Sequence, residues 1–492
     1  MNKTDVKLPC PPPILGLSFR TNRKEIISPA SPDRFPQTAR IAPRKSHTTG
    51  RKQPQQLEPM TARPRPPDSL IEPEEETNPR FRFFIPPTYQ QKNLPPRISP
   101  VVSNAPIDPN EAIEKYSTLL TPYEVTEILD FPEIYFVGFK NKKNDINISD
   151  LKSFGFDDFQ NGYYKVQPGD HIIYRFEVQG LIGQGKHGQV YKCYDHKLHL
   201  QRAVKMIANT RRSSTQSKVE MTILSRLKKL HPEGIETAQI YFLFRQHMFV
   251  TFNILSKDVT QLMKLNDIST LSPRLVKCIA MDVLDQMKDY QSVGVTIHGQ
   301  ILPENILLVP DTNAEFKLID FSNAILERNF PKDYEYEVPK GYMAPETILG
   351  LEVGEGFDMW CLGCLLVFLT TGKPLFEASD DANLLNEIID LLGLPNDRIK
   401  KKIPAAKRQE FFDKNSGGIK KNLLDPSAPV RKEATMNLKM VLGTNDQEFV
   451  DFLLKIFTWD PDDRLTVDQA LHLPYIANTE SRMPEPNEEE EG

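Results

Sequence analysis

A glycine-rich element is the feature that most constrains the fold of this chain. Residues 183–190 read GQGKHGQV, a GxGxxGxV pattern set between segments whose apolar residues alternate as in β-strands. The same spacing occurs in dinucleotide-binding folds, where a helix begins directly after the glycines. Here the glycines precede a strand, and the next strand carries Ala203-Val204-Lys205. This order favours a hairpin that covers phosphate groups over a dinucleotide fold.

The hairpin and the strand after it contain the residue types that hold a nucleotide. Glycines let the backbone approach phosphates closely, and Lys205 is a cation that could reach the same phosphates. Upstream of the glycines, a strand is expected over 171–178. A helix is expected over 219–230, and the spacing of Glu220 from its apolar neighbours points it inward toward Lys205. An ordinary β-hairpin with surface charges is the alternative. The nucleotide-lining residues expected here are Gly183, Gly185, Gly188, Val190 and Ala203.

Later segments strengthen this interpretation through their order and spacing. Residues 298–305 read HGQILPEN, and Asp320-Phe321-Ser322 follows 15 positions after Asn305. The segments 344–346 (APE) and 358–363 (DMWCLG), and then Arg464, complete the series. Together these elements resemble the motifs of a protein kinase. The resemblance implies that Glu346 pairs with Arg464, that Asp358 caps the catalytic loop, and that His298 is a packing residue.

Within the kinases, the chain resembles the dual-specificity tyrosine-regulated kinase (DYRK) family of the CMGC group. The resemblance covers residues 118–476, and the segments RQEFFDK and DQALHLPYI are similar to the fourth, testis-associated branch. It implies ATP and Mg²⁺ as cofactors, and phosphorylation of Tyr336 in active relatives. The segments that carry it are TPYE (121–124), EIYF (133–136), PGDHIIYRFEV (168–178), YEY (334–336) and GKPLF (372–376).

The catalytic loop departs from this family. Active relatives read HCDLKPEN, so Gln300 stands in the position of the general base and Leu302 in the position of the catalytic-loop lysine. An amide cannot accept the substrate proton, and a leucine side chain has no hydrogen-bond donor. Loss of a positioned general base typically slows a reaction by about 10²–10⁴. We therefore expect impaired phosphotransfer.

The activation segment departs as well, whereas the nucleotide residues remain. Relatives read YIQSRFYRAPE and this chain reads YEVPKGYMAPE, so Lys340 and Met343 replace two arginines that would clamp a phosphate on Tyr336. Ser322 replaces the glycine of the metal-binding triplet. By contrast, Asn305 and Asp320 offer the oxygen ligands that Mg²⁺ prefers. The other retained nucleotide residues are Lys205, Glu220, and Phe252 and Leu255 of the segment expected to contact adenine.

Composition bounds the remaining possibilities. About half of the 41 prolines fall in the first hundred residues, where basic residues outnumber acidic ones, and this predicts a disordered tail over 1–110. The net charge of -5 gives no reason to expect nucleic-acid binding. Neither a signal peptide nor a membrane span is expected. Of the five cysteines, Cys361 and Cys364 form one CxxC pair in an apolar segment, where they are most simply core, and no second such pair occurs to complete a metal site; this favours a reducing cytoplasmic, or also nuclear, setting. A monomer is expected.

The sequence thus predicts an α+β protein with the bilobal kinase fold, a small β-sheet-rich N-lobe and a larger helical C-lobe. The expected order is the tail 1–110, an accessory segment 118–175, a kinase domain 176–476 divided at 255/256, and an acidic tail 477–492. Three functions stay open: an ATP-binding pseudokinase with a scaffold or allosteric role, a weakly active Ser/Thr/Tyr kinase acting on protein substrates, and a nucleotide-independent interaction protein.

Overall fold

The structure is a computed structural model that describes residues 100, 105–143, 156, 160–231, 238–310, 312, 314–327, 336–413, 420 and 434–478. The proline-rich tail up to residue 99, Tyr334 and the acidic tail from residue 479 lie outside the described residues, together with the predictions made for them.

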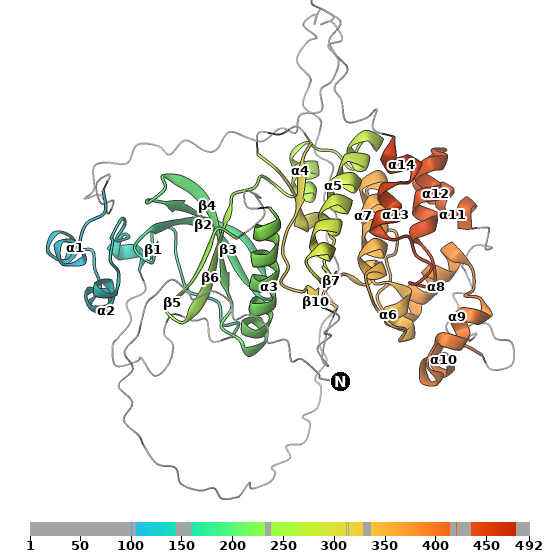
Figure 1. Cartoon of the computed structure of the whole chain (residues 1–492), viewed down its shortest axis with the longest axis horizontal. Coiled ribbons are helices and arrows are strands. Elements are labelled where there is room, and N and C mark those ends of the chain that lie inside the picture. Colours follow the sequence, from blue (N-terminus) through green and yellow to red (C-terminus); the bar gives the residue numbers. More distant parts are fainter. Residues whose placement is uncertain are drawn as a thin grey trace, which may run out of the picture. The chain divides into compact units, whose positions relative to one another are not determined.

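A six-stranded antiparallel sheet forms the first part of the fold, with strand order β1-β2-β3-β4-β6-β5 (Figure 1). The expected strand over 171–178 is interrupted: Ile173 and Tyr174 adopt φ angles of 47° and 53°, so a turn separates β1 from β2. The strands are β1 (His171–Ile172), β2 (Phe176–Gly185), β3 (Gly188–Asp195), β4 (Leu200–Ile207), β5 (Ile240–Phe244) and β6 (His247–Asn253).

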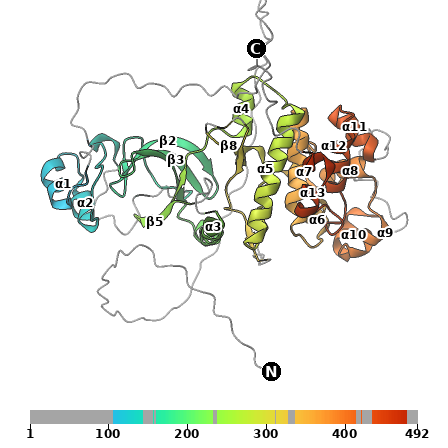
Figure 2. The same ribbon diagram turned by 45° about the horizontal axis from the view of Figure 1, so that its top comes forward.

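Helix α3 (Arg211–Leu230) links the sheet to the helical part. It begins eight residues before the expected start at 219, because the Thr210 side chain accepts a hydrogen bond from the Ser213 amide and caps it. Its buried face, with Ile223 and Leu224, belongs to the same apolar cluster as α5 (Pro273–Ser292). Figures 1 and 2 both show α3 between the sheet and α5.

The second part is built of helices around α7 (Gly356–Thr371), which is buried on almost every side. This confirms the predicted α+β class with a sheet-rich part followed by a helical part. Among the described residues, no helix combines the length and apolar character needed to cross a membrane. The other helices are α4 (Val259–Leu265), α6 (Pro345–Leu349), α8 (Asp381–Leu392), α9 (Asp397–Lys402), α10 (Ala405–Phe411), α11 (Ala434–Leu442), α12 (Gln447–Ile456), α13 (Val467–Leu471) and α14 (Pro474–Ala477). The short strands of this part are β7 (Val295–Ile297), β8 (Ile306–Leu308), β9 (Phe316–Leu318) and β10 (Ile325–Leu326).

Two buried polar anchors in this part hold the loops that bear the site. Asp358 of α7 accepts hydrogen bonds from the backbone amides of His298 (2.6 Å) and Gly299 (2.9 Å), as expected for a residue that caps the catalytic loop. Arg464 forms a bidentate pair with Glu346 at 2.7 and 2.8 Å, and both side chains are fully buried. Because both anchors are shielded from water, they hold the loop after β7 and the segment before α6 firmly.

An accessory segment packs at the β1 edge of the sheet (Figure 1). It begins before residue 118, since α1 (Pro109–Tyr116) already buries Ala112 and Tyr116 in the same cluster as Tyr174. Helix α2 (Pro122–Glu127) follows with a capping box formed by Thr121 and Glu124. The ordered accessory segment therefore includes part of the region that the sequence assigns to the disordered tail.

Arg245 joins this segment to the sheet. Its guanidinium lies in the β5–β6 turn, 2.7 Å from Glu127 and 3.2 Å from Glu124. Glu124 also contacts Lys143 at 2.6 Å and His171 at 2.8 Å, and is itself buried. Burial alone would raise the pKa of Glu124, but the surrounding cationic groups outweigh it and hold the pKa well below the usual value.

Candidate functional site

Lys205 is the centre of the candidate nucleotide site. Its position on β4 places it between Val190 on β3 and Val250 on β6. The Nζ atom lies 2.6 Å from Glu220 Oε1 on α3 and 2.8 Å from Asp320 Oδ1. Burial would lower the pKa of Lys205, but the two carboxylates outweigh it and raise the pKa above its usual value. The predicted Lys205–Glu220 pair is confirmed, and Lys205 remains a cation.

The glycine-rich loop is the turn between β2 and β3, as predicted. Gly183 and Gly185 are exposed or half-exposed, and a Cβ on Gly185 would meet no atom within 4 Å. Gly188 is different, because a Cβ there would lie 2.3 Å from the Met206 carbonyl oxygen. The absence of a side chain at Gly188 therefore lets β3 lie close against β4, the strand that bears Lys205.

The residues expected around an adenine ring come from neighbouring strands. Ala203 on β4 is the register partner of Phe252 on β6, and Val190 lies on the adjoining strand β3. Leu255 follows β6 directly and is half-buried. The sheet thus brings Ala203, Val190 and Phe252 to the same neighbourhood as Lys205.

In the catalytic loop, Gln300 and Leu302 have distinct surroundings. The Gln300 side-chain amide donates a hydrogen bond from Nε2 to the Glu337 carbonyl oxygen at 3.1 Å, while its Oε1 is buried and finds no hydrogen-bond partner within the described part of the chain. Leu302 is only 4 % exposed and packs in the main apolar core. Asn305 donates from Nδ2 to the Gln300 carbonyl oxygen at 3.0 Å, which orients its amide. Neither Gln300 nor Leu302 offers a carboxylate or a cation.

Asp320 faces Lys205 from the other side. It adopts a φ of 73°, and its Oδ1 accepts a hydrogen bond from the Ser322 amide at 3.1 Å. Burial would raise the pKa of Asp320, but the adjacent Lys205 outweighs it and holds the pKa well below the usual value. Phe321 is buried against His298, with 4.8 Å between ring centroids. Packing of Phe321 into the helical part leaves Asp320 pointing toward Lys205 rather than away from it.

The residues in the positions of the two clamping arginines contact other groups. Lys340 pairs with Asp381 at 2.7 Å, and Met343 packs against the apolar core. Tyr336 lies 5.2 Å from Phe357 between ring centroids, and its pKa is raised to about 12, first by burial and then by Glu346. Phosphorylation of Tyr336 stays a prediction.

Sequence reasoning missed Glu337. Its carboxylate lies 2.8 Å from Lys186 and 3.0 Å from His187 in the glycine-rich loop, and 3.0 Å from Arg212 on α3. Burial would raise the pKa of Glu337, but hydrogen bonds from His187 and Lys186 lower it to about 2. The signal in the sequence is the acidic residue directly after Tyr336, in the segment YEVP.

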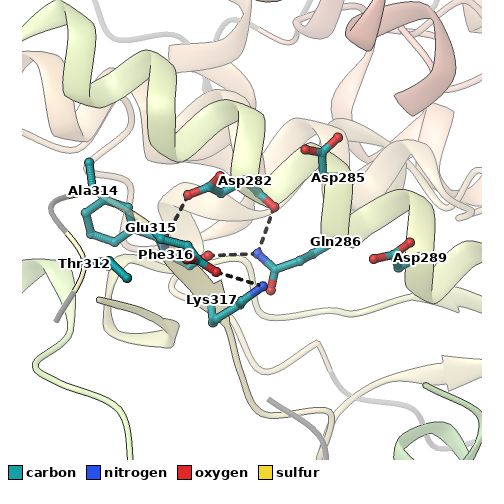
Figure 3. Close-up of a pocket in the computed structure, with 9 residues that line it drawn as sticks. All are labelled: Asp282, Asp285, Gln286, Asp289, Thr312, Ala314, Glu315, Phe316 and Lys317. Atoms are coloured by element: carbon teal, nitrogen blue, oxygen red, sulfur yellow. Dashed lines mark hydrogen bonds and ion pairs between the residues drawn. The ribbon is translucent and has the colours of Figure 1, made fainter. Parts of the chain in front are cut away.

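A groove of about 480 Å³ lies elsewhere, along α5 and the turn before β9 (Figure 3). Asp282 Oδ2 accepts a hydrogen bond from the Phe316 amide at 2.8 Å, and Gln286 Nε2 donates to the Phe316 carbonyl oxygen at 3.1 Å. These bonds tie the turn to α5. None of the residues that line this groove is among the predicted site residues.

Comparisons with known proteins agree with this geometry. The protein kinase domain family matches residues 176–476. The human dual specificity tyrosine-phosphorylation-regulated kinase 4 is 36 % identical over 391 residues, which cover 79 % of this chain and 74 % of the human protein. The chain belongs to the DYRK family of protein kinases. The mouse dual specificity tyrosine-phosphorylation-regulated kinase 3 is 35 % identical over 409 residues, covering 79 % of this chain and 68 % of that protein.

A third DYRK relative, the probable serine/threonine-protein kinase dyrk2 of Dictyostelium discoideum, is 36 % identical over 375 residues, or 75 % of this chain and 40 % of that protein. The three identities lie within one percentage point of each other, so they support the DYRK family and do not single out a branch.

Proposed function

We propose that this DYRK-family protein binds ATP with Mg²⁺ but is catalytically impaired, and that it acts as a scaffold or allosteric partner for other proteins. The observation that carries the proposal is the state of Gln300. The group in the position of the general base is a hydrogen-bond donor that is already engaged by the Glu337 carbonyl oxygen. The similarity of its C-terminal segments leads us to place it in the fourth, testis-associated branch.

The nucleotide side of the site fits MgATP. Lys205 is held by Glu220 and Asp320 in a position where it could bind phosphate oxygens. Asp320 and the amide oxygen of Asn305 are oxygen donors of the kind that Mg²⁺ takes. When bound, the metal would neutralise charge on the phosphates. The glycine-rich loop would cover them.

The acceptor side does not fit an efficient phosphotransferase. A substrate hydroxyl must pass its proton to an acceptor, and Gln300 is a neutral amide. The Leu302 side chain lies in the apolar core, so it supplies no cation for the developing charge on the transferred phosphoryl group. Substrate orientation and charge stabilisation are therefore both weakened, whereas nucleotide binding is not.

Two measurements on the full-length protein test this proposal. Thermal unfolding with increasing MgATP is expected to show stabilisation in the wild type and none in an Asp320→Asn variant. Absence of stabilisation in the wild type would instead favour the nucleotide-independent interaction protein. Radiometric phosphotransfer is expected to be at background, and activity that disappears in Asp320→Ala would refute the impairment.

A weakly active kinase is the second candidate, because one observation favours it. The Lys205–Glu220 pair is formed, and Asp320 is directed toward Lys205. Positioning contributes most of the catalysis in phosphoryl transfer, and this arrangement retains it on the nucleotide side. Phosphotransfer by the wild type distinguishes the candidates: activity above background that disappears in Asp320→Ala favours the weakly active kinase. A gain of about 10²-fold or more in Gln300→Asp would show that the general base was limiting.

A further inference from the structure

We infer that Glu337 is a positioning residue: its carboxylate holds the tip of the glycine-rich loop and the first turn of α3 against the activation segment. The inference rests on the proposed function, because the loop that Glu337 holds is the one that would cover the nucleotide.

Nitrogen atoms of side chains from two separate elements converge on the Glu337 carboxylate. Oε1 lies 2.8 Å from Lys186 and 3.0 Å from Arg212, and Oε2 lies 3.0 Å from His187. The Glu337 side chain is 13 % exposed and His187 is 8 % exposed, so this contact is shielded from water. Charge-assisted hydrogen bonds that are shielded in this way are stronger than exposed ion pairs. Lys186 and Arg212 are more exposed and contribute less.

The backbone of Glu337 is held by the catalytic loop. Gln300 Nε2 donates to the Glu337 carbonyl oxygen at 3.1 Å. An aspartate in position 300 would bring a carboxylate oxygen, which accepts hydrogen bonds only, toward that carbonyl oxygen. The substitution that removes the general base therefore supplies the donor that fixes Glu337. The side chain and the backbone of one residue thus join the catalytic loop, the glycine-rich loop and α3.

The glycine-rich loop is also held from its outer side. The Tyr163 hydroxyl, in the accessory segment, donates a hydrogen bond to the Gly185 carbonyl oxygen at 3.0 Å. Gly185 thus contacts the accessory segment, while the next two residues of the loop tip, Lys186 and His187, contact Glu337 of the activation segment. These contacts form with an unmodified Tyr336, and Lys340 pairs with Asp381 at 2.7 Å.

This arrangement, which we call the Glu337 latch, has a consequence for the site. The tip of the glycine-rich loop is held by the carboxylate of an ordinary side chain, Glu337. Bound nucleotide would leave only when the latch opens locally, so release of nucleotide would be slow. The Glu337 backbone also occupies the hydrogen-bond donor of Gln300, the residue that a substrate hydroxyl would approach.

Hydrogen exchange on the full-length protein without nucleotide tests the latch independently of nucleotide binding. In Glu337→Gln, we expect backbone amides of residues 182–190 to exchange about tenfold faster than in the wild type, the change that corresponds to 1.4 kcal/mol. The exposed Glu352 provides a matched control, because Glu352→Gln removes the same charge outside the latch. Equal exchange of the loop in the two variants would overturn the inference.

A double-mutant cycle shows whether Arg212 and Glu337 act together. Arg212→Gln should raise exchange of the loop less than Glu337→Gln, and the double variant should show less than the combined effect. Independent, additive effects would argue against a shared contact. If Glu337→Gln does not fold, Gln300→Glu tests the latch from the catalytic loop, since it replaces the amide donor by an acceptor. Unchanged loop exchange in Gln300→Glu would equally contradict the latch.

A fluorescent ADP analogue with Mg²⁺ then separates the latch from the proposed function. If the wild type binds the analogue, its dissociation rate should rise about tenfold in Glu337→Gln and stay unchanged in Glu352→Gln. An unchanged dissociation rate in Glu337→Gln refutes the role of the latch in nucleotide release. A wild type that binds no analogue refutes nucleotide binding, while the exchange result obtained without nucleotide still decides whether Glu337 holds the loop.

Discussion

Replacement of Lys205 by methionine should destabilise the fold as well as the nucleotide site. Methionine keeps most of the apolar stem but removes the ammonium group that lies 2.6 Å from Glu220 and 2.8 Å from Asp320. The Glu220 side chain is 3 % exposed, so its carboxylate would remain buried beside a second carboxylate. Removal of one partner from a buried ion pair costs about 3–5 kcal/mol. At about 2 °C for each kcal/mol in a domain of this size, the melting temperature should fall by roughly 6–10 °C.

The assay is thermal unfolding without nucleotide, followed by circular dichroism and by the fluorescence of Trp360 and Trp459. An exposed lysine, Lys401, provides the control, because Lys401→Met should change the free energy of unfolding by no more than about 0.5 kcal/mol. A Lys205→Met, Glu220→Gln variant should recover part of the loss, since the buried charge is gone. Equal melting temperatures for Lys205→Met and Lys401→Met would refute this reasoning. If Lys205→Met is destabilised as expected, a loss of ATP binding in this variant cannot be separated from its instability. Asp320→Asn is therefore the better test of nucleotide binding.

The other predictions concern stability. Glu124→Gln should lower the free energy of unfolding, with its full effect above about pH 4.5. Because the folded pKa of Glu124 is depressed, the difference from wild type should shrink as the pH falls below this value. Urea unfolding between pH 7 and pH 3.5 measures this difference, and a pH-independent difference would contradict the prediction. Because position 302 lies in the core, Leu302→Lys should lower the free energy of unfolding by about 2–5 kcal/mol and Leu302→Met by less than about 1.5 kcal/mol. Chemical denaturation compares the two variants, and equal stabilities would place side chain 302 outside the core. Arg464→Met should lower the free energy of unfolding by about 3–5 kcal/mol, because it leaves Glu346 buried without its cation, and the loss should be smaller in the double variant with Glu346→Gln. Equal losses in the single and double variants, measured by chemical denaturation, would exclude the unpaired carboxylate as the cause.

Much of the site was predictable because each part of it depends on a short motif. The glycine spacing, the lysine on the following strand and the inward face of α3 each follow from local patterns, and they predicted the Lys205–Glu220 pair. The Arg464–Glu346 contact was predictable for a different reason. It joins residues 118 positions apart, and only the resemblance to kinases connected them.

Contacts between irregular segments could not be predicted from local patterns. Glu337 and His187 are 150 positions apart, and Arg245 and Glu127 are 118 positions apart. A single glutamate or arginine in a loop has no periodicity that identifies its partner. The interruption of the expected 171–178 strand was missed for a similar reason, because Ile173 and Tyr174 favour strands by propensity but adopt positive φ angles in a turn fixed by tertiary packing.

The salt-bridge network of Arg245 also bears on where the folding unit begins. The family match starts at residue 176, yet Glu124, Glu127 and two of the aromatic rings that cover this guanidinium, Tyr123 and Phe156, come from earlier in the chain. A fragment cut at the start of the family match would carry an arginine stripped of its counterions, next to an apolar sheet edge exposed to water. The smallest fragment that can stand alone should therefore start near residue 105, ahead of α1, and the boundaries of sequence homology and of autonomous folding differ by about seventy residues.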